Sequence, residues 1–210
     1  MAARQVDLVH WHRADQFRFF RRYERPHYAV TSRLDVSRMR GAGKVAIASP
    51  YRACIHAIGA GIHGVPELLM RFRDDTVFIH DRVDLSMTVA LDNGNFNYAY
   101  VPWLADFSAF DAQCAALIAV AKAGGDLKGN TGQRDDLAYL SCMPWLDYSS
   151  INNAMPGPDD CIPRVTWGKF TDDGHGRHSM AMTIEVHHAL VDGRQVGDYF
   201  ALVQAALSAF

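Results

Sequence analysis

Residues able to do chemistry gather in one segment near the C-terminus, His187-His188-Ala189-Leu190-Val191-Asp192-Gly193. A histidine can take a proton from a hydroxyl or an amine near neutral pH, so the segment suits general-base catalysis. Gly193 fits a turn that needs unusual backbone angles. The alternative interpretation is an ordinary turn after a strand, with two histidines on the surface.

The flanking residues indicate how such a histidine would be held. Residues 180–186 form a strand-like run, and residues 195–210 form a helix-like run. The histidine pair therefore lies where a predicted strand ends and the chain turns toward a predicted helix.

The rest of the chain supplies the elements that must position this segment. Residues 15–23 predict a short amphipathic helix, with Phe17, Phe19 and Phe20 as candidates for burial. Further helices are predicted at 50–62 and 107–123, and strands at 28–36, 69–73, 76–80, 85–91, 96–101, 136–142, 164–170 and 179–186. Because helices and strands do not alternate strictly, we expect an α/β protein with a mixed sheet and helices packed on it.

Length and composition point to one globular domain spanning residues 1–210, since 49% of the 210 residues are hydrophobic and 21% are charged. The net charge of −2 and the lack of long charged runs argue against binding to nucleic acid or a membrane surface. No apolar stretch reaches the ~18 residues of a membrane span, and the N-terminus lacks a signal-peptide core. We therefore expect a cytoplasmic protein.

Cysteines and histidines elsewhere do not indicate a metal site. Cys54, Cys114, Cys142 and Cys161 are widely spaced, which favours buried free thiols in a reducing compartment. The segments 10–12 and 175–178 each contain two histidines, but neither has convincing ligand spacing or a supporting cluster of acids or cysteines. We expect no bound metal.

Several other segments occur in the order and at the spacing of one known family. They are Trp11-His12-Arg13-Ala14-Asp15-Gln16-Phe17 (W-x-R-x-x-x-F), Thr31-Ser32-Arg33-Leu34-Asp35-Val36 (T-x-x-x-D-[IV]), Ser141-Cys142-Met143-Pro144-Trp145 (S-x-x-P-W), and residues 67–75, 81–84 and 165–170. With the HHxxxDG motif, they make the chain resemble the type A chloramphenicol acetyltransferases nearly end to end. Lipoyl-linked acyltransferase cores and condensation domains of peptide synthetases share a related histidine motif, but the remaining segments favour the first family.

The resemblance implies a two-layer sandwich and direct acetyl transfer from acetyl-CoA within a ternary complex. His188 would be the general base for the acceptor hydroxyl. Asp192 would pair with Arg13 instead of the histidine, because a direct aspartate contact would favour the protonated, inactive imidazole. Ser141 would donate a hydrogen bond to the oxyanion. The alternatives are a solvated surface arginine at Arg13 and a serine that caps the Pro-Trp turn.

The same resemblance implies the binding residues. Thr166 would hold a water near the reacting centre, unless it is an ordinary strand residue. Coenzyme A would contact Trp145, Lys169 and Phe170, although burial of Trp145 in a core is an equal alternative. The active site would lie between the subunits of a homotrimer, with the histidine from one chain and the acceptor wall from its neighbour. Expected wall residues are Phe19, Phe20, Glu24, Pro26, Phe96 and Tyr139.

Departures from the family pattern gather where the acceptor should bind. Phe20 replaces a tyrosine, Glu24 replaces a small or aliphatic residue, and Tyr139 replaces an asparagine; Gln195 stands where a histidine is usual. If Glu24 is buried, it needs a cationic partner, for which Arg21, Arg22 and Arg25 are candidates; the alternative is that Glu24 faces solvent. Despite these departures, the resemblance of the whole chain predicts a chloramphenicol O-acetyltransferase. The alternatives are an acyltransferase for another small alcohol or amine, and a non-catalytic trimer that binds CoA or the drug.

Overall fold

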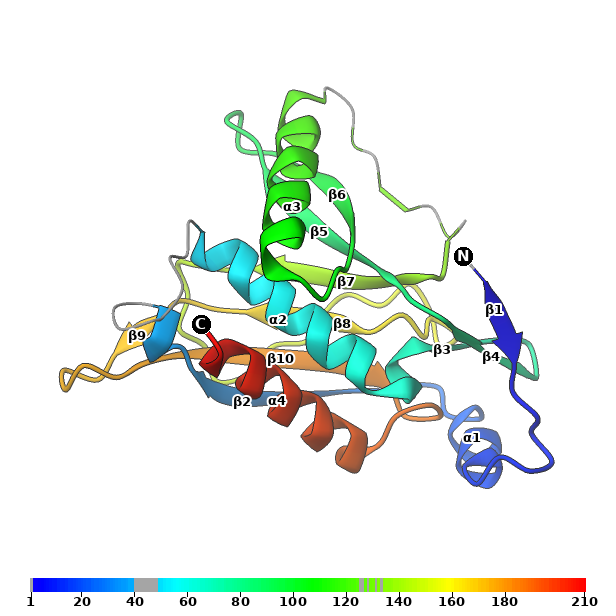
Figure 1. Ribbon diagram of the computed structural model, residues 1–210. Helices are drawn as coiled ribbons and strands as arrows, with labels where there is room; N and C mark the ends of the chain where they lie inside the picture. The colour runs from blue at the N-terminus through cyan, green and yellow to red at the C-terminus, as the bar shows by residue number, and fades with distance from the viewer. Residues whose placement is uncertain (1, 40–48, 125–126, 128, 131, 133) are drawn as a thin grey trace.

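The computed structural model of the protein describes residues 2–39, 49–124, 127, 129–130, 132 and 134–210. A mixed sheet runs through the centre of the molecule (Figure 1). Its strands lie in the order β2 (His27–Asp35), β10 (His178–His187), β8 (Arg164–Trp167), β7 (Leu137–Cys142), β5 (Asp84–Ala90) and β6 (Phe96–Pro102), and β9 (Thr171–Asp172) pairs with β10. β7 is parallel to both of its neighbours, whereas the other described pairs are antiparallel.

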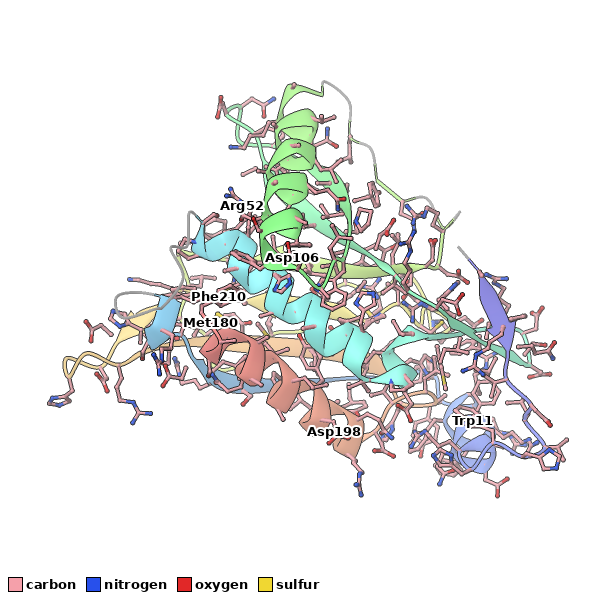
Figure 2. The ribbon with its side chains drawn as sticks, in the orientation of Figure 1. Trp11, Arg52, Asp106, Met180, Asp198 and Phe210 are labelled. Atoms are coloured by element: carbon pink, nitrogen blue, oxygen red, sulfur yellow. The ribbon has the colours of Figure 1, made fainter. Side chains whose placement is uncertain are left out.

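Three helices form a second layer on one face of this sheet: α2 (Pro50–Gly64), α3 (Phe107–Ala123) and α4 (Gly193–Ser208) (Figure 1). α2 and α4 approach closely at Gly61, where a Cβ atom would lie 2.5 Å from the Val203 side chain. Arg52, labelled in Figure 2 at the start of α2, donates two hydrogen bonds of 2.6 and 2.9 Å to Asp111 of α3. The two-layer architecture expected from the sequence is confirmed.

The alternation of β10 decides which of its residues enter the apolar core. Met180 contacts Cys54 of α2 through sulfur atoms 3.9 Å apart, and Met182 accepts the Tyr199 hydroxyl of α4 at 3.5 Å. Even-numbered residues therefore face the helices. Because side chains alternate along a strand, odd-numbered residues such as Thr183, Glu185 and His187 lie on the opposite face.

One end of the molecule carries a smaller antiparallel sheet and the first helix (Figure 1). The sheet orders β1 (Ala3–Gln5), β4 (Thr76–His80) and β3 (Met70–Arg73), with a short 3-10 helix at Pro66–Leu69 before β3. α1 (Ala14–Phe20) lies beside them, next to Trp11 (Figure 2). β1 is fully exposed along its length, which explains why no apolar pattern in the sequence marks it.

Two expectations about local structure need correction. Phe19 is 56% exposed, so only Phe17 of the three candidate phenylalanines is fully buried. The strand expected at 164–170 ends at Trp167; beyond it, the Lys169 N–H donates to the Leu146 carbonyl at 2.7 Å instead of to a neighbouring strand. Among the described residues, no helix has the length and apolar character of a membrane span.

Candidate active site

His188 is fixed at the end of β10 by its backbone and by two aromatic rings. Its N–H donates to the Pro26 carbonyl at 2.9 Å. Its ring stacks on Phe20 with centroids 3.8 Å apart and 10° between the planes, and Tyr28 packs against it at 4.6 Å. The half-buried side chain has its Nδ1 covered, without a hydrogen-bond partner in the described part of the chain. The ring is therefore held in one orientation, with Nε2 left to meet a substrate.

The neighbouring His187 is structural. It is 2% exposed, its Nε2 lies 2.9 Å from the Pro158 carbonyl, and its Nδ1 accepts the Ala189 N–H at 3.1 Å. Both contacts require a neutral ring with its proton on Nε2. Burial, assisted by nearby His27, lowers the pKa of His187 to about 4. Because both ring nitrogens are engaged, the second histidine of the motif is the candidate base.

His187 makes folding stability depend on pH. Its pKa is about 4 in the folded protein against 6.5 for an unperturbed histidine, so the unfolded chain binds more protons between these values. Stability is fully present at pH 7, and on the order of 3 kcal/mol is lost as pH falls from 6.5 to 4. Urea unfolding at several pH values and one protein concentration measures this slope. His187→Asn should flatten it; an unchanged slope in the variant would contradict the assignment.

Asp192 joins the start of α4 to α1. Its Oδ1 accepts the Arg194 N–H at 3.0 Å, and the Gln195 side chain accepts the Asp192 N–H at 3.1 Å, which completes a capping box. Its Oδ2 accepts a hydrogen bond from Arg13, which is only 4% exposed and precedes α1. Burial is the largest single influence and acts to raise the pKa of Asp192, but the hydrogen bonds from Arg13 and Arg194 and the nearby positive charges together lower the pKa. In the described residues, no hydrogen bond joins Asp192 to the His188 ring.

Ser141 and Thr166 lie side by side in a row of hydroxyl residues that crosses the sheet. Ser141 of β7 is in register with Thr166 of β8, which is in register with Thr183 of β10, and Thr183 with Thr31 of β2. The Thr31 and Thr183 hydroxyls are 2.7 Å apart. Thr166 is 1% exposed, and its hydroxyl donates to Asn153 at 3.4 Å. The row lies on the face opposite the helices, because it includes odd-numbered Thr183.

A cavity of about 780 Å³ occupies this face, and Ser141 lines it. Tyr139, two residues earlier on β7, lines it too, as do Thr88 of β5 and Tyr98 of β6. Further lining residues include Phe72 of β3, Asn130 before β7, and Asn153 and Asp160 before β8. The volume of the cavity lies in the range of small-molecule binding sites.

His188 does not line this cavity. Thr183 marks the level of Ser141 on β10, and His188 follows it by five residues. An extended strand covers about 16 Å in that distance, and two strand spacings add about 10 Å sideways. The two groups therefore cannot act on the same substrate atom within one chain.

The expected acceptor wall divides into two groups. Phe19, Phe20 and Tyr23 form an aromatic group with centroids 5.0, 5.2 and 5.3 Å apart, next to buried Pro26 and exposed Glu24. Tyr139 lines the cavity, and Phe96, 47% exposed, begins the edge strand β6. The expectation that Phe20 faces the histidine from a neighbouring chain is wrong, because Phe20 stacks on His188 of its own chain. Phe96 is likewise not beside the α1 group, because four strand positions separate β6 from β10.

The candidate CoA residues lie together where β7 and β8 end. The Lys169 N–H donates to the Leu146 carbonyl at 2.7 Å, and the Met143 N–H donates to the Trp167 carbonyl at 2.9 Å, so the two segments are tied to each other. Trp145 is 71% exposed, Lys169 is exposed and Phe170 is half-buried. The alternative of a core position for Trp145 is thereby excluded in this chain.

The cysteines are poorly suited to form an acyl-enzyme. All four are free. Burial raises the pKa of Cys114 and of Cys142 to about 12, and it also raises the pKa of Cys54 and Cys161. Because the thiolate is the nucleophile, these thiols are inert near neutral pH. In the described residues, no group of three or more His, Cys, Asp or Glu side chains is placed to hold a metal.

Comparison with known proteins identifies the family. The family model described as chloramphenicol acetyltransferase matches residues 1–204. The chain belongs to the chloramphenicol acetyltransferase family. It is 24% identical over 202 residues to chloramphenicol acetyltransferase 3 of Escherichia coli, covering 95% of this chain and 94% of that protein. A chloramphenicol acetyltransferase of Klebsiella is 27% identical over 201 residues, which cover 91% of this chain and 88% of that protein.

Solved structures agree on the fold. A chloramphenicol acetyltransferase superposes with a TM-score of 0.89 at 24% identity, covering 98% of this chain and 100% of the other. A dihydrolipoamide acetyltransferase from Azotobacter vinelandii superposes with a TM-score of 0.65 at 12% identity, covering 93% of this chain and 86% of the other. The architecture is therefore shared with lipoyl-linked acetyltransferases, whereas the family match makes this chain an acetyltransferase of the chloramphenicol type.

Sequence reasoning missed several residues that lie around His188 and the cavity. Tyr28 was assigned only to a strand, and the Pro26 carbonyl was not foreseen as the acceptor for His188. Asn153 and Glu185 were also missed: the backbone and side chain of Asn153 donate to buried Glu185 at 2.7 and 3.0 Å. A buried glutamate in an otherwise apolar strand was the available signal. Glu24, by contrast, is exposed, and Arg21 instead pairs with Asp159.

Proposed function

We propose that the protein transfers the acetyl group of acetyl-CoA to a hydroxyl of chloramphenicol and so inactivates the antibiotic. The observation that carries this proposal is the oriented His188 ring, whose Nδ1 is buried and whose Nε2 has no hydrogen bond within the described residues, in a chain of the chloramphenicol acetyltransferase family. The free cysteines favour a reducing, cytoplasmic setting.

The chemistry follows from the two candidate groups. Nε2 of His188 takes the proton of the acceptor hydroxyl as its oxygen attacks the thioester carbonyl carbon. The Ser141 hydroxyl donates a hydrogen bond to the oxygen that becomes negatively charged. The intermediate collapses when the carbon–sulfur bond breaks, and the proton on His188 passes to the departing sulfur of CoA. Asp192 and Arg13 hold the histidine turn, and Thr166 holds a water near the centre.

The separation of His188 from Ser141 supports a site shared between copies of the chain. If each site takes its histidine from one protomer and its serine cavity from the next, a ring of three identical protomers closes with three equal sites. We therefore propose a cyclic homotrimer, in which the α1 aromatic group and His188 of one protomer face the cavity of its neighbour.

Trp145, Lys169 and Phe170 are proposed to bind CoA, with the indole on the pantetheine arm and the ammonium near the phosphates. Trp145→Ala and Lys169→Ala should each raise the KM for acetyl-CoA about tenfold, through loss of apolar contact and of a charge-assisted hydrogen bond respectively. The kcat should change little. Lys122→Ala, which removes an exposed lysine from α3, is the matched control. Unchanged KM values in both variants would remove these residues from the CoA site.

A thiol-release assay tests the function. Purified protein is mixed with acetyl-CoA and chloramphenicol, and free CoA is followed with a thiol reagent, with product mass confirming a single added acetyl group. Rapid release supports the proposal. No release with chloramphenicol, together with release with other alcohols or amines, would reject chloramphenicol as the substrate.

A different small acceptor is the second candidate. It is favoured by Tyr139, which lines the cavity together with Ser141 and stands where the family pattern has an asparagine. A third possibility, a binder of CoA or drug without turnover, would show binding of both ligands but no thiol release.

A further inference from the structure

Tyr139 lines the cavity that contains Ser141, and its hydroxyl is hydrogen-bonded to Asn130, another residue of the cavity wall. The two residues are separated by one position on β7, so their side chains leave the same face of the sheet with Cα atoms about 7 Å apart. Tyr139 is therefore close enough to Ser141 to contact an acceptor molecule bound for reaction, but it sits at a different point of that molecule.

The direction of the hydrogen bond to Tyr139 is fixed by Asn130. The Asn130 Oδ1 accepts the Arg134 N–H at 3.2 Å, and its Nδ2 donates to the Arg134 carbonyl at 2.7 Å. These two bonds determine which end of the amide is nitrogen. The same Nδ2 lies 2.8 Å from the Tyr139 hydroxyl, so the amide donates and the phenol oxygen accepts. The phenol proton is therefore not used in this bond.

Arg164 holds the ring of Tyr139 in place. Its guanidinium lies 5.1 Å from the ring centroid, and it is itself fixed by two hydrogen bonds to Asp160 at 2.9 and 3.0 Å. A cation on the face of a phenol stabilises the ring position and makes the hydroxyl a better hydrogen-bond donor. The hydroxyl is thus a fixed donor whose proton is available to a ligand.

The charges around the cavity disfavour an anionic ligand at this donor. Arg164 is paired with Asp160, and Arg134 is paired with both Asp84 and Asp136 at 2.8 Å. A carboxylate on the ligand would have to displace one of these partners, and it would also meet Asp135 in the cavity wall. A neutral oxygen accepts a phenol proton without that cost.

We propose that Tyr139 determines acceptor specificity by donating a hydrogen bond to a second, neutral oxygen of the acceptor alcohol, such as a carbonyl, ether or nitro oxygen, with Asn130 and Arg164 as positioning residues. The inference rests on the proposed function, since it concerns the same cavity and the same acetyl transfer. The Tyr139 hydrogen bond distinguishes alcohols that carry such an oxygen from simple alcohols that do not.

The experiment compares wild type, Tyr139→Phe and Asn130→Asp with two acceptors. Chloramphenicol carries an amide carbonyl and a nitro group, whereas 2-phenylethanol has no oxygen besides its hydroxyl. Tyr139→Phe deletes the donor. Asn130→Asp keeps the phenol but replaces its donor partner by a carboxylate, which accepts a hydrogen bond from the phenol and so withdraws that donor from the ligand. Both variants should raise the KM for chloramphenicol about tenfold, with kcat, the KM for acetyl-CoA and all 2-phenylethanol kinetics unchanged.

A wild-type KM for chloramphenicol in Tyr139→Phe would overturn the inference, and so would an equal loss with 2-phenylethanol, which would indicate a packing role. Calorimetric titration of chloramphenicol into the protein with CoA repeats the comparison without turnover. Wild type that binds chloramphenicol but releases no CoA contradicts the proposed function alone, and the binding difference still tests Tyr139. Wild type that neither binds nor acetylates it overturns both.

Discussion

His188→Ala is expected to lower kcat by about 10²–10⁴-fold while leaving the fold intact, because it removes the base that takes the acceptor proton. The side chain is half-buried, and within the described residues it contacts the rings of Phe20 and Tyr28 without a hydrogen bond, so its loss should cost little stability. Thiol release with saturating acetyl-CoA and chloramphenicol measures the effect. His187→Asn at pH 7 is the neighbouring control, and near-normal turnover in His188→Ala would end the general-base assignment.

Mixing two inactive variants should restore activity if the site is shared. His188→Ala lacks the base, and Ser141→Ala lacks the oxyanion donor, which typically lowers kcat about 10²–10³-fold. A trimer that contains both variants has one interface at which an intact histidine faces an intact serine. Refolding the two variants together in equal amounts should therefore recover about one quarter of wild-type activity. No recovery above the sum of the separate variants would show that both groups act within one chain.

Asp192→Asn and Asp192→Ala are expected to destabilise the protein by about 3–5 kcal/mol, because each leaves the buried Arg13 charge without a carboxylate. The Nε and Nη2 atoms of Arg13 are already buried without a partner in the described residues, so no other contact replaces the lost one. The same variants also lower turnover, since the His188 turn loses its attachment to α1.

The double variant Arg13→Met/Asp192→Asn separates charge pairing from other effects. It removes the buried cation together with its partner, so it should regain much of the stability lost in Asp192→Asn. Urea unfolding at one protein concentration provides the comparison, because assembly changes apparent stability. If Asp192→Asn unfolds within about 1 kcal/mol of wild type, the pair does not carry the stability assigned to it.

The sequence predicts helices and strands far better than it predicts the contacts between them. The helix at Phe107–Ala123 was predicted at its observed bounds, because an apolar pattern and two glycines mark it locally. The position of His188 after a strand was likewise a local inference. The pairing of Arg13 with Asp192 came only through family resemblance, since nothing local links two residues so far apart.

Contacts that depend on the order of strands in the sheet could not be predicted from the sequence. The row from Thr31 through Thr183 and Thr166 to Ser141 depends on β10 lying between β2 and β8, which no run of residues specifies. The stacking of Phe20 on its own His188 depends on α1 lying at the end of β10, and this corrected the expected acceptor wall. The exposure of Trp145 could not be predicted either, because indole side chains occur both in cores and at binding surfaces.

The contact of Arg13 with Asp192 joins positions 179 residues apart in the chain. During synthesis, residue 13 leaves the ribosome long before residue 192, so the Arg13 guanidinium has no counter-ion until residue 192 has been made. Sequence separations of this size slow folding, because loop closure has to precede the stabilising contact. Nascent chains stopped before residue 192 should therefore leave the histidine turn unformed.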